Sequence, residues 1–420
     1  MNRDTLDSLR KIEVRPTTLA GEKRHVSYVY FITRRPLNNR FEEWKLSLFF
    51  SKTVLHHIKH FVDGMLSTGF TGTLTDIQRE SLKERDRRTL SHFLTQGKWD
   101  ASYLERIVQR VAFQQVKACA QRECSPMFVI LDDAVCEKIQ PSSQAAHMIQ
   151  GASFQHSHLK RRHVYGHAVV QTLLRSGDQV FPFATACYYP QGKSKIELAG
   201  DMIQAVPMSS CRTYVLMDSW YPSTSVLQTC AERGFHVISG LKTNRIFYPQ
   251  GIRQSLQSFA SYISKTDTDL VTIGSSAYRV YRYEGKLNLV ENAVLLLRWK
   301  DGEGIDPKQM KAFLCTDVSL SNGEILNFYS KRWTIETYFR TVKVQLAMER
   351  YQVRSAQGID RYLTLLFFSA LCCTCRNHGS LIDGIHGYRI QKKHDMIEYI
   401  CNQAQRGATL DQIKTRLRVA

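Results

Sequence analysis

Four residues with reactive side chains lie within one short stretch of the chain, YSKRWTIETYFRTVK. They are Tyr329, Arg332, Glu336 and Lys343. No Gly or Pro interrupts the stretch, which therefore predicts a helix. At about 100° per residue the four side chains fall within an arc of roughly 60° on one face of that helix. A carboxylate flanked by a guanidinium, an ammonium and a phenol suits chemistry on a metal-bound phosphate, whereas an ordinary solvated helix face is the alternative.

Further acids follow two apolar runs elsewhere in the chain. PMFVILDDAV reaches Asp132 and Asp133, and RTYVLMDSWY reaches Asp218. Both runs predict strands that end at their acids. Chemistry in α/β sheets collects at the carboxyl ends of strands. Acids at the ends of two separate strands are therefore candidates for a shared site.

The acids come together if the helix that carries Glu336 packs across the sheet near these two strands. Clustered carboxylates repel one another and do not all ionise cheaply. Divalent cations relieve this repulsion, and oxygen ligands favour Mg²⁺ or Mn²⁺. Two such ions about 4 Å apart can activate a water or a 3′-OH and stabilise the leaving oxygen of a phosphodiester.

The composition points to a polyanionic partner. The chain of 420 residues carries 57 Lys and Arg against 38 Asp and Glu, a net charge of +19. Such an excess favours nucleic acid first and an anionic membrane surface second. No apolar run reaches the roughly 18 residues that span a bilayer, and residues 362–375 are expected to form a buried helix. The N-terminal segment lacks the apolar core of a secretory signal.

Cysteine and histidine offer weaker signals. The 11 cysteines are scattered, which indicates reduced and mostly buried thiols rather than a zinc site. The basic residues Lys160, Arg161 and Arg162 favour a turn that faces phosphate. The alternative for this region is a metal cluster formed by neighbouring histidines: His156, His158, His163 and His167.

The elements that must position these residues change in type along the chain. Residues 46–118 predict several short helices, between which basic residues suit a compact DNA-binding unit or an ordinary solvated face. From residue 125 the order strand, hairpin, helix, strand, helix, strand predicts a mixed α/β sheet. Residues 244–318 predict a β-rich insertion, and residues 388–420 predict two basic helices. The basic residues of the helical region are Arg79, Lys83, Arg85, Arg87 and Arg88.

The spacing Tyr329-x2-Arg332-x3-Glu336-x6-Lys343 resembles the YREK signature of DDE transposases of insertion-sequence family four. LDDAV and VLMDSWY resemble the first and second aspartate motifs of that family, and the β-rich insertion before the glutamate helix matches its plan. The resemblance covers roughly residues 125–378. It implies an RNase H-like fold, two Mg²⁺ (or Mn²⁺) ions, recognition of terminal inverted repeats in double-stranded DNA, and cut-and-paste strand transfer into target DNA.

The resemblance also implies roles for single residues. Asp218 and Glu336 would be metal ligands. For the first aspartate, the Asp-x-Thr pattern favours Asp132, with Ala134 at the Thr position, whereas a competing alignment favours Asp133. Neighbours on a strand point to opposite faces, so only one of the two is expected to bind metal directly. The phosphate contacts implied are those of Tyr329, Arg332 and Lys343.

The resulting division is a helical DNA-binding region over 1–120, an RNase H-like core over 121–243 and 319–380, the insertion over 244–318, and a helical tail over 381–420. Paired transposon ends imply a homodimer on DNA, acting at the nucleoid in a bacterial cytoplasm without a membrane. Two alternatives stay open: a domesticated, non-catalytic DNA-binding protein, and an RNase H-like nuclease without strand transfer. Some relatives cleave through a DNA hairpin and hold a flipped base on a Trp in a strand of the insertion. The matching strand here, KAFLCTDVS, has no Trp, so the hairpin pathway stays open and is not implied.

Overall fold

The computed structural model describes residues 35–79, 86–142, 144–145, 148–157, 160–287, 290–376 and 379–417. The N-terminal segment in which no secretory signal is expected lies outside these residues, as do Lys83, Arg85 and His158.

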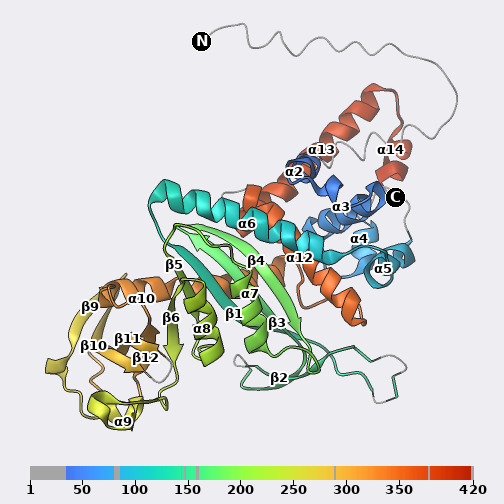
Figure 1. The fold of residues 1–420 in the computed structure, drawn as a ribbon. Coiled ribbons are helices and arrows are strands. Elements are labelled where there is room, and N and C mark those ends of the chain that lie inside the picture. The colour runs from blue at the N-terminus through green and yellow to red at the C-terminus, as the bar shows by residue number, and fades with distance from the viewer. Residues whose placement is uncertain are drawn as a thin grey trace, which may run out of the picture.

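A ten-stranded mixed sheet forms the centre of the molecule (Figure 1). The strands follow the order β2-β3-β1-β5-β6-β12-β11-β10-β9, and β4 pairs with β3. The mixed α/β sheet expected from the sequence is thereby confirmed, with helices at both ends of the chain. The strands are β1 (Met127–Glu137), β2 (Ser153–Ser157), β3 (Arg162–Ser176), β4 (Gln179–Tyr188), β5 (Thr213–Met217), β6 (His236–Leu241), β9 (Asp269–Ile273), β10 (Ser276–Leu287), β11 (Val290–Lys300) and β12 (Lys311–Cys315).

The centre of the sheet is parallel, whereas its outer parts are antiparallel. β1 pairs with β5 and β5 with β6 in parallel. Every residue of β5 is buried, which fits a continuous apolar run covered on both faces. β3 and β4 form the expected hairpin, in which Gly177 takes a φ of 54° that glycine adopts without strain.

The segment expected as a β-rich insertion extends the same sheet. Its last strand, β12, pairs antiparallel with β6, and β11, β10 and β9 follow outward. A small separate sheet is formed by β7 (Ile246–Phe247) and β8 (Gln254–Ser255).

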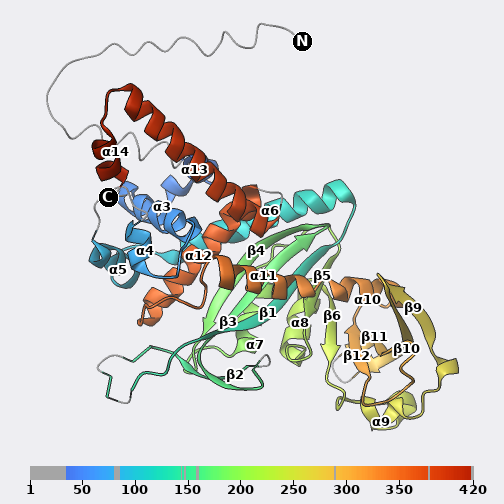
Figure 2. The same cartoon turned by 180° about the vertical axis from the view of Figure 1, so that it is seen from behind.

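Helices cover both faces of the sheet. α6, α7 and α8 lie in front of it in Figure 1, and α10 and α11 lie on the opposite face, which Figure 2 shows from behind. Side chains cap several of these helices; Ser194 and Glu197, for example, form a capping box at the start of α7. The helices of this part are α6 (Ala101–Glu123), α7 (Lys195–Gln204), α8 (Thr224–Glu232), α9 (Leu256–Ala260), α10 (Asn322–Ser330) and α11 (Trp333–Gln345).

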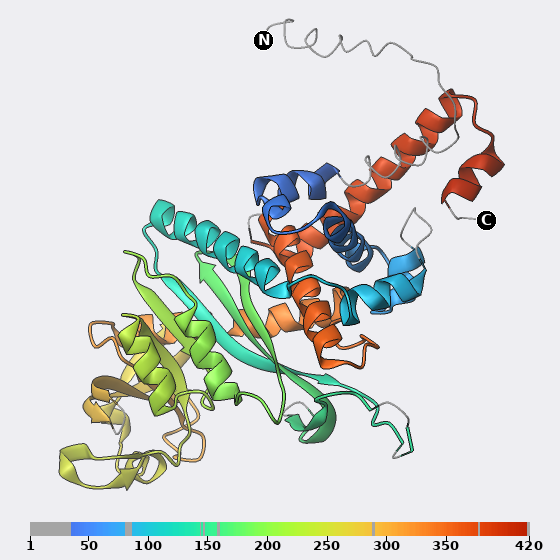
Figure 3. The same cartoon turned by 45° about the vertical axis from the view of Figure 1, so that its right-hand side comes forward.

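The remaining helices gather at one end of the sheet around α12 (Figure 3). α12 contacts β4 and α6 on one side and the N-terminal helices α3 and α5 on the other. By length and composition alone α12 could cross a membrane, but 89% of its most apolar window is buried inside the protein, as expected for a core helix. These helices are α2 (Arg35–Glu43), α3 (Lys52–Leu66), α4 (Leu74–Arg79), α5 (Arg87–Thr95), α12 (Ala356–Arg376), α13 (Leu381–Gln405) and α14 (Leu410–Leu417).

Two local predictions are wrong. The single helix expected over 329–343 is divided into α10 and α11, because residues 331–335 form i to i−3 hydrogen bonds that tighten the chain into a turn. The strand expected to end at Asp132 and Asp133 continues to Glu137, because β3 goes on pairing with it after β5 has diverged. Asp132 and Asp133 therefore lie within β1, just beyond the residues of β1 that pair with β5.

Candidate active site

The register between β1 and β5 brings two of the predicted acids together. The parallel pairing ends at Ile130 opposite Leu216, and Asp132 and Asp218 each lie two residues further along. Side chains two residues apart on a strand share a face. The negative charge of Asp218 accordingly acts on Asp132. Asp218 is itself fixed by its Oδ1, which accepts a hydrogen bond from the backbone N–H of Trp220 at 2.9 Å.

The third acid arrives from α11, which lies against β1. A bridging guanidinium links the two elements: Arg332 donates from Nη1 to Asp132 Oδ2 at 2.8 Å and from Nη2 to Glu336 Oε1 at 2.5 Å. Arg332 is the N-cap residue directly before α11, where its side chain reaches both β1 and the first turn of the helix. Asp132 and Glu336 are thus held on either side of one positive charge.

The contact with Arg332 does not fully compensate the negative charge of Asp132. Burial raises its pKa to about 7; Arg332 acts in the opposite direction, and the negative charge of Asp218 raises the pKa further. The pKa of Arg332 is also raised, because the attraction of Tyr329, Asp132 and Glu336 outweighs the effect of burial. A second cation at Asp132 would relieve both the burial cost and the repulsion.

Asp133 faces the other side of the sheet and is fully engaged there. Its Oδ2 accepts from Lys195 Nζ at 2.7 Å, and its Oδ1 accepts from the Tyr221 hydroxyl at 2.8 Å. The structure therefore brings Asp132, and not Asp133, to the side of Asp218 and Glu336. Sequence reasoning missed Lys195 and Tyr221, because they lie 62 and 88 residues from Asp133 and carry no motif of their own.

Tyr329 ends α10 beside the acids. Its ring meets Phe313 edge to face at a centroid distance of 4.8 Å. Its hydroxyl lies over Gly240, where an added Cβ would come within 3.1 Å of it and within 3.2 Å of the Ser219 backbone nitrogen. Gly240 therefore leaves the space through which Tyr329 reaches the end of β5.

Lys343 and the basic turn lie apart from the carboxylates. Lys343 donates to the carbonyl of Val135 at 2.8 Å and pairs with Glu349 at 3.1 Å, so it ties α11 to β1. Arg161 and Arg162 are exposed at the turn between β2 and β3.

The histidines near that turn do not form a metal cluster within the described residues. His156 and His163 face each other across β2 and β3, with ring centroids 5.5 Å apart. His167 is buried, and its two ring nitrogens face the carbonyl of Gln150 and the hydroxyl of Tyr351.

The acids fit a divalent cation by their chemistry, although their side chains are not gathered around one point. Within the described part of the chain, no three His, Cys, Asp or Glu side chains are close enough together to hold a metal ion. The donor set of Asp132, Asp218 and Glu336 consists of carboxylate oxygens, which Mg²⁺ and Mn²⁺ prefer. The guanidinium of Arg332 supplies positive charge to Asp132 and Glu336 in this arrangement.

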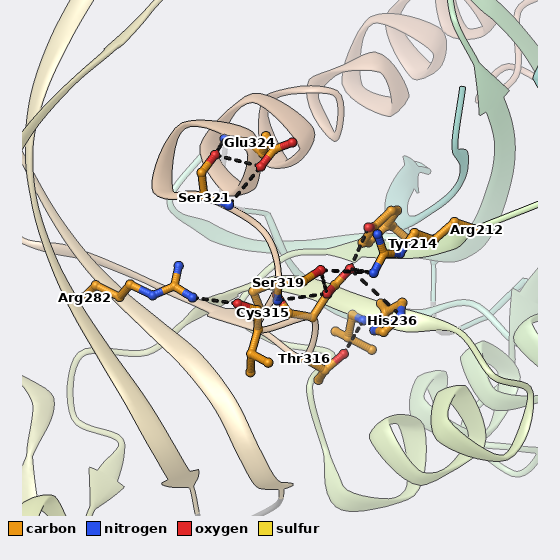
Figure 4. Close-up of polar contacts among 12 residues, drawn as sticks. Arg212, Tyr214, His236, Arg282, Cys315, Thr316, Ser319, Ser321 and Glu324 are labelled. Carbon is orange, nitrogen blue, oxygen red and sulfur yellow. Dashed lines mark hydrogen bonds and ion pairs between the residues drawn. The ribbon is translucent and has the colours of Figure 1, made fainter. Parts of the chain in front are cut away.

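Another acid, Asp317, has a different environment, and Figure 4 shows its neighbours Arg212, Tyr214 and Ser319. It follows β12, and its Oδ2 accepts from the Tyr214 hydroxyl at 2.7 Å and pairs with Arg212 at 3.0 Å. Its Oδ1 accepts from the backbone and hydroxyl of Ser319 at 3.1 and 2.6 Å. The ring of His236 stacks on Tyr214, with its Nε2 3.9 Å from the same carboxylate.

Comparison with known families gives one match. The family model described as the transposase DDE domain matches residues 129–372, more than half of the chain. The matched region runs from β1 into α12 and contains all three of Asp132, Asp218 and Glu336. Among curated proteins, no match is found.

Proposed function

Because the chain belongs to the family of transposase DDE domains, we propose that it is a DNA transposase of insertion-sequence family four with the YREK signature. It cleaves at the ends of a transposon and transfers the freed 3′-OH into target DNA. The observation that supports this proposal is the bridge that Arg332 forms between Asp132 of β1 and Glu336 of α11, with the charge of Asp218 acting on Asp132. The net charge of +19 supports DNA as the substrate.

Asp132, Asp218 and Glu336 would hold two Mg²⁺ or Mn²⁺ ions. When bound, such ions activate the attacking oxygen and stabilise the leaving one. Asp133 supports the site from the opposite face, where Lys195 and Tyr221 fix the strand that carries Asp132.

Arg332 is the residue that couples DNA to the acids. In the structure it bridges Asp132 and Glu336. A phosphate forms charge-assisted bidentate contacts with a guanidinium and therefore competes with the carboxylates for it. Engagement of the DNA end would turn Arg332 toward phosphate and release both carboxylates for metal.

Tyr329 would donate its hydroxyl to a phosphate near the cleaved bond. Arg161 and Arg162 would contact the backbone from the β2–β3 turn. Lys343 donates to the carbonyl of Val135 and pairs with Glu349, and its third N–H would contact a phosphate.

The partners that follow from this function are double-stranded DNA, as terminal inverted repeats and as target, and a second copy of the chain on paired ends. The place of action would be the nucleoid in a bacterial cytoplasm.

The test uses full-length protein, Mg²⁺ and DNA that carries the inverted repeats found beside the gene. Glu336→Gln should lower the cleavage rate by about a thousandfold or more, with DNA affinity largely retained, because the amide cannot replace a metal-binding carboxylate. Glu232→Gln is the control, since Glu232 is exposed on α8 and contacts Gln228. Equal cleavage by wild type and Glu336→Gln would exclude the proposal.

A second readout separates the transposase from its alternatives. Joining of the cleaved 3′ end to target DNA is expected. Cleavage without joining and without end specificity would indicate a nuclease, and metal-independent binding without any cleavage would indicate a domesticated DNA-binding protein.

A further inference from the structure

The two ends of α11 are fastened to β1 in different ways. α11 lies against β1 on the face of the sheet that Figure 2 shows. At its start, Arg332 connects the helix to the strand. Beyond its end, the connection is made by Lys138, which follows β1 directly. Nζ of Lys138 donates to the carbonyls of Glu349 at 2.6 Å and of Tyr351 at 2.8 Å, so one ammonium holds the loop that follows α11.

Lys138 is placed to hold this loop rather than to meet solvent. Its side chain is half-buried, and burial lowers its pKa to about 8. Nζ also lies 3.3 Å from the centre of the Tyr351 ring, a cation–π contact in addition to the two hydrogen bonds. A buried ammonium is costly unless its donors are used. The loss of this side chain would therefore free the loop at two carbonyls and one ring.

A residue of β3 anchors Tyr351 in turn. The Tyr351 hydroxyl and Nδ1 of His167 are 2.7 Å apart, and both side chains are buried. Nε2 of His167 faces the carbonyl of Gln150 at 2.9 Å. Burial lowers the pKa of His167, so its ring is neutral at pH 7 and has one donor and one acceptor. Because a carbonyl only accepts, Nε2 carries the proton and Nδ1 accepts from the Tyr351 hydroxyl.

The loop that Lys138 holds contains a strained residue. Ala347 lies two residues after α11 and has a φ of 50°, in the left-handed region that residues with a Cβ rarely adopt. Such a backbone conformation persists only where its surroundings fix it. Ala347 and its neighbours Leu346 and Met348 are buried in the core. A loop freed from Lys138 would relax at Ala347, and the end of α11 would move with it.

The two connections of α11 respond differently to DNA under the proposed function. A phosphate draws Arg332 away from the acids, which releases the start of the helix. Both carbonyl contacts of Lys138 lie in the chain beyond α11, so they remain when Arg332 leaves. The position of Glu336 relative to Asp132 then depends on the connection at the end of the helix.

We propose that Lys138 is a positioning residue for Glu336, an inference that rests on the proposed action of the chain as a transposase. By holding the loop after α11 on β1, it keeps Glu336 at the distance from Asp132 that two ligands of one cation require while Arg332 binds DNA. Tyr351, fixed by its hydroxyl, supports Lys138. A displacement of about 1 Å in an active site lowers a rate by about a hundredfold, so a loosened helix is sufficient to slow cleavage.

The experiment measures single-turnover cleavage of end-containing DNA by full-length protein in saturating excess, over a series of Mg²⁺ concentrations. Under these conditions the rate constant does not depend on the fraction of protein that is folded. Lys138→Met keeps the aliphatic chain and removes the donors. It should lower the rate constant by about 10- to 100-fold and raise the Mg²⁺ concentration for half-maximal rate by about tenfold, with the dissociation constant for DNA within about twofold of wild type.

Lys300→Met is the matched control, because Lys300 also lies at the end of a strand, β11, and forms an exposed ion pair with Glu303. It should cleave like wild type. If Lys138→Met cleaves as fast as this control, Lys138 does not position Glu336. A DNA affinity lowered by about tenfold with an unchanged rate constant would make Lys138 a DNA contact and would likewise contradict the proposal.

Tyr351→Phe is a milder variant, which tests the same connection if Lys138→Met does not fold. It keeps the ring beside Lys138 and removes only the hydroxyl that meets His167. Its rate constant should fall by about three- to tenfold, the cost of one buried hydrogen bond, with unchanged DNA affinity. A rate constant equal to that of wild type overturns the proposal.

Hydrogen exchange distinguishes a failure of this inference from a failure of the proposed function. The amides of residues 346–351 should exchange about tenfold faster in Lys138→Met than in wild type or Lys300→Met, both in free protein and in the complex with DNA. A wild-type protein that does not cleave refutes the proposed function. A wild type that cleaves, together with unchanged exchange in Lys138→Met, refutes the positioning role alone.

Discussion

Two aspartates, the half-buried Asp132 of β1 and the buried Asp317 after β12, differ in how far neighbouring groups compensate their negative charges. Asp317 is 4% exposed at its side chain and is surrounded by donors from Tyr214, Ser319 and Arg212. Burial alone would raise its pKa, but the hydrogen bonds from Ser319 and Tyr214 outweigh it, so the pKa lies below the ordinary value. Asp317 is charged, satisfied and structural: it ties β12, β5 and the start of α10 together.

Asp132 has one guanidinium, one backbone N–H and a neighbouring carboxylate. Its pKa is raised above the ordinary value, to about 7, whereas the pKa of Asp317 is lowered. A carboxylate whose only role was to stabilise the fold would have several hydrogen-bond donors around it, as Asp317 has. The incomplete compensation at Asp132 is what the proposed metal-binding role predicts, because a carboxylate that binds a cation from outside gives up some stability in the fold.

The largest expected effect separates the two aspartates by activity. Asp132→Asn should lower cleavage of end-containing DNA by about a thousandfold or more, because it removes the proposed metal ligand. Its free energy of unfolding should be equal to or higher than that of wild type, because repulsion from Asp218 is removed. Cleavage kinetics and urea unfolding of the same preparation measure both quantities. An active Asp132→Asn protein would show that Asp132 is not part of the site.

The reverse pattern is expected for Asp317→Asn. Removing one partner of a buried charged pair costs about 3 kcal/mol, and Tyr214 and Ser319 lose the charge they donate to. Urea unfolding should show this loss, whereas cleavage measured well below the melting temperature should remain. Asp178→Asn is the control, because the Asp178 side chain is fully exposed. If Asp317→Asn were as stable as wild type, the contrast between the two aspartates would collapse.

The sequence predicted the strand that carries Asp132 but not the role of Asp317. The apolar runs before Asp132 and Asp218 predicted the strands, and the spacing around Glu336 predicted the acid that joins them. The choice between Asp132 and Asp133 was open because it depends on Lys195 and Tyr221, which only the tertiary fold brings near.

Other features of the fold also could not be predicted from local patterns in the sequence. No Gly or Pro marks the break between α10 and α11; the turn coincides with the reach of Arg332 to Asp132 across 200 residues. The pairing of β12 with β6, which makes the insertion part of the main sheet, is a long-range contact without a sequence signal. The role of Asp317 was missed for the same reason, since its partners come from β5 and β6.

Asp132 should also make the free energy of unfolding depend on pH. The folded pKa of Asp132 is raised from 3.8 to about 7, so its contribution to stability is present below pH 4 and is lost as the pH rises through about 7. Asp132→Asn should thus match wild type near pH 4 and exceed it by about 2 kcal/mol at pH 8, since solvent at the partly exposed side chain relieves part of the shift. Urea unfolding at both pH values measures this difference. A constant difference across the range would show that Asp132 is not under-neutralised.

The smallest effect concerns a single hydroxyl. Tyr214→Phe removes the donor to Asp317 Oδ2 while keeping the ring that stacks on His236, and should cost about 1 to 2 kcal/mol of unfolding free energy. Tyr399→Phe is a matched control, because Tyr399 is as buried but its hydroxyl has no partner within the described residues. That variant should be neutral or slightly stabilising. Equal losses in the two variants would mean that removing a buried hydroxyl costs the same with or without a hydrogen bond to a carboxylate. The donors around Asp317 would then not explain why its behaviour differs from that of Asp132.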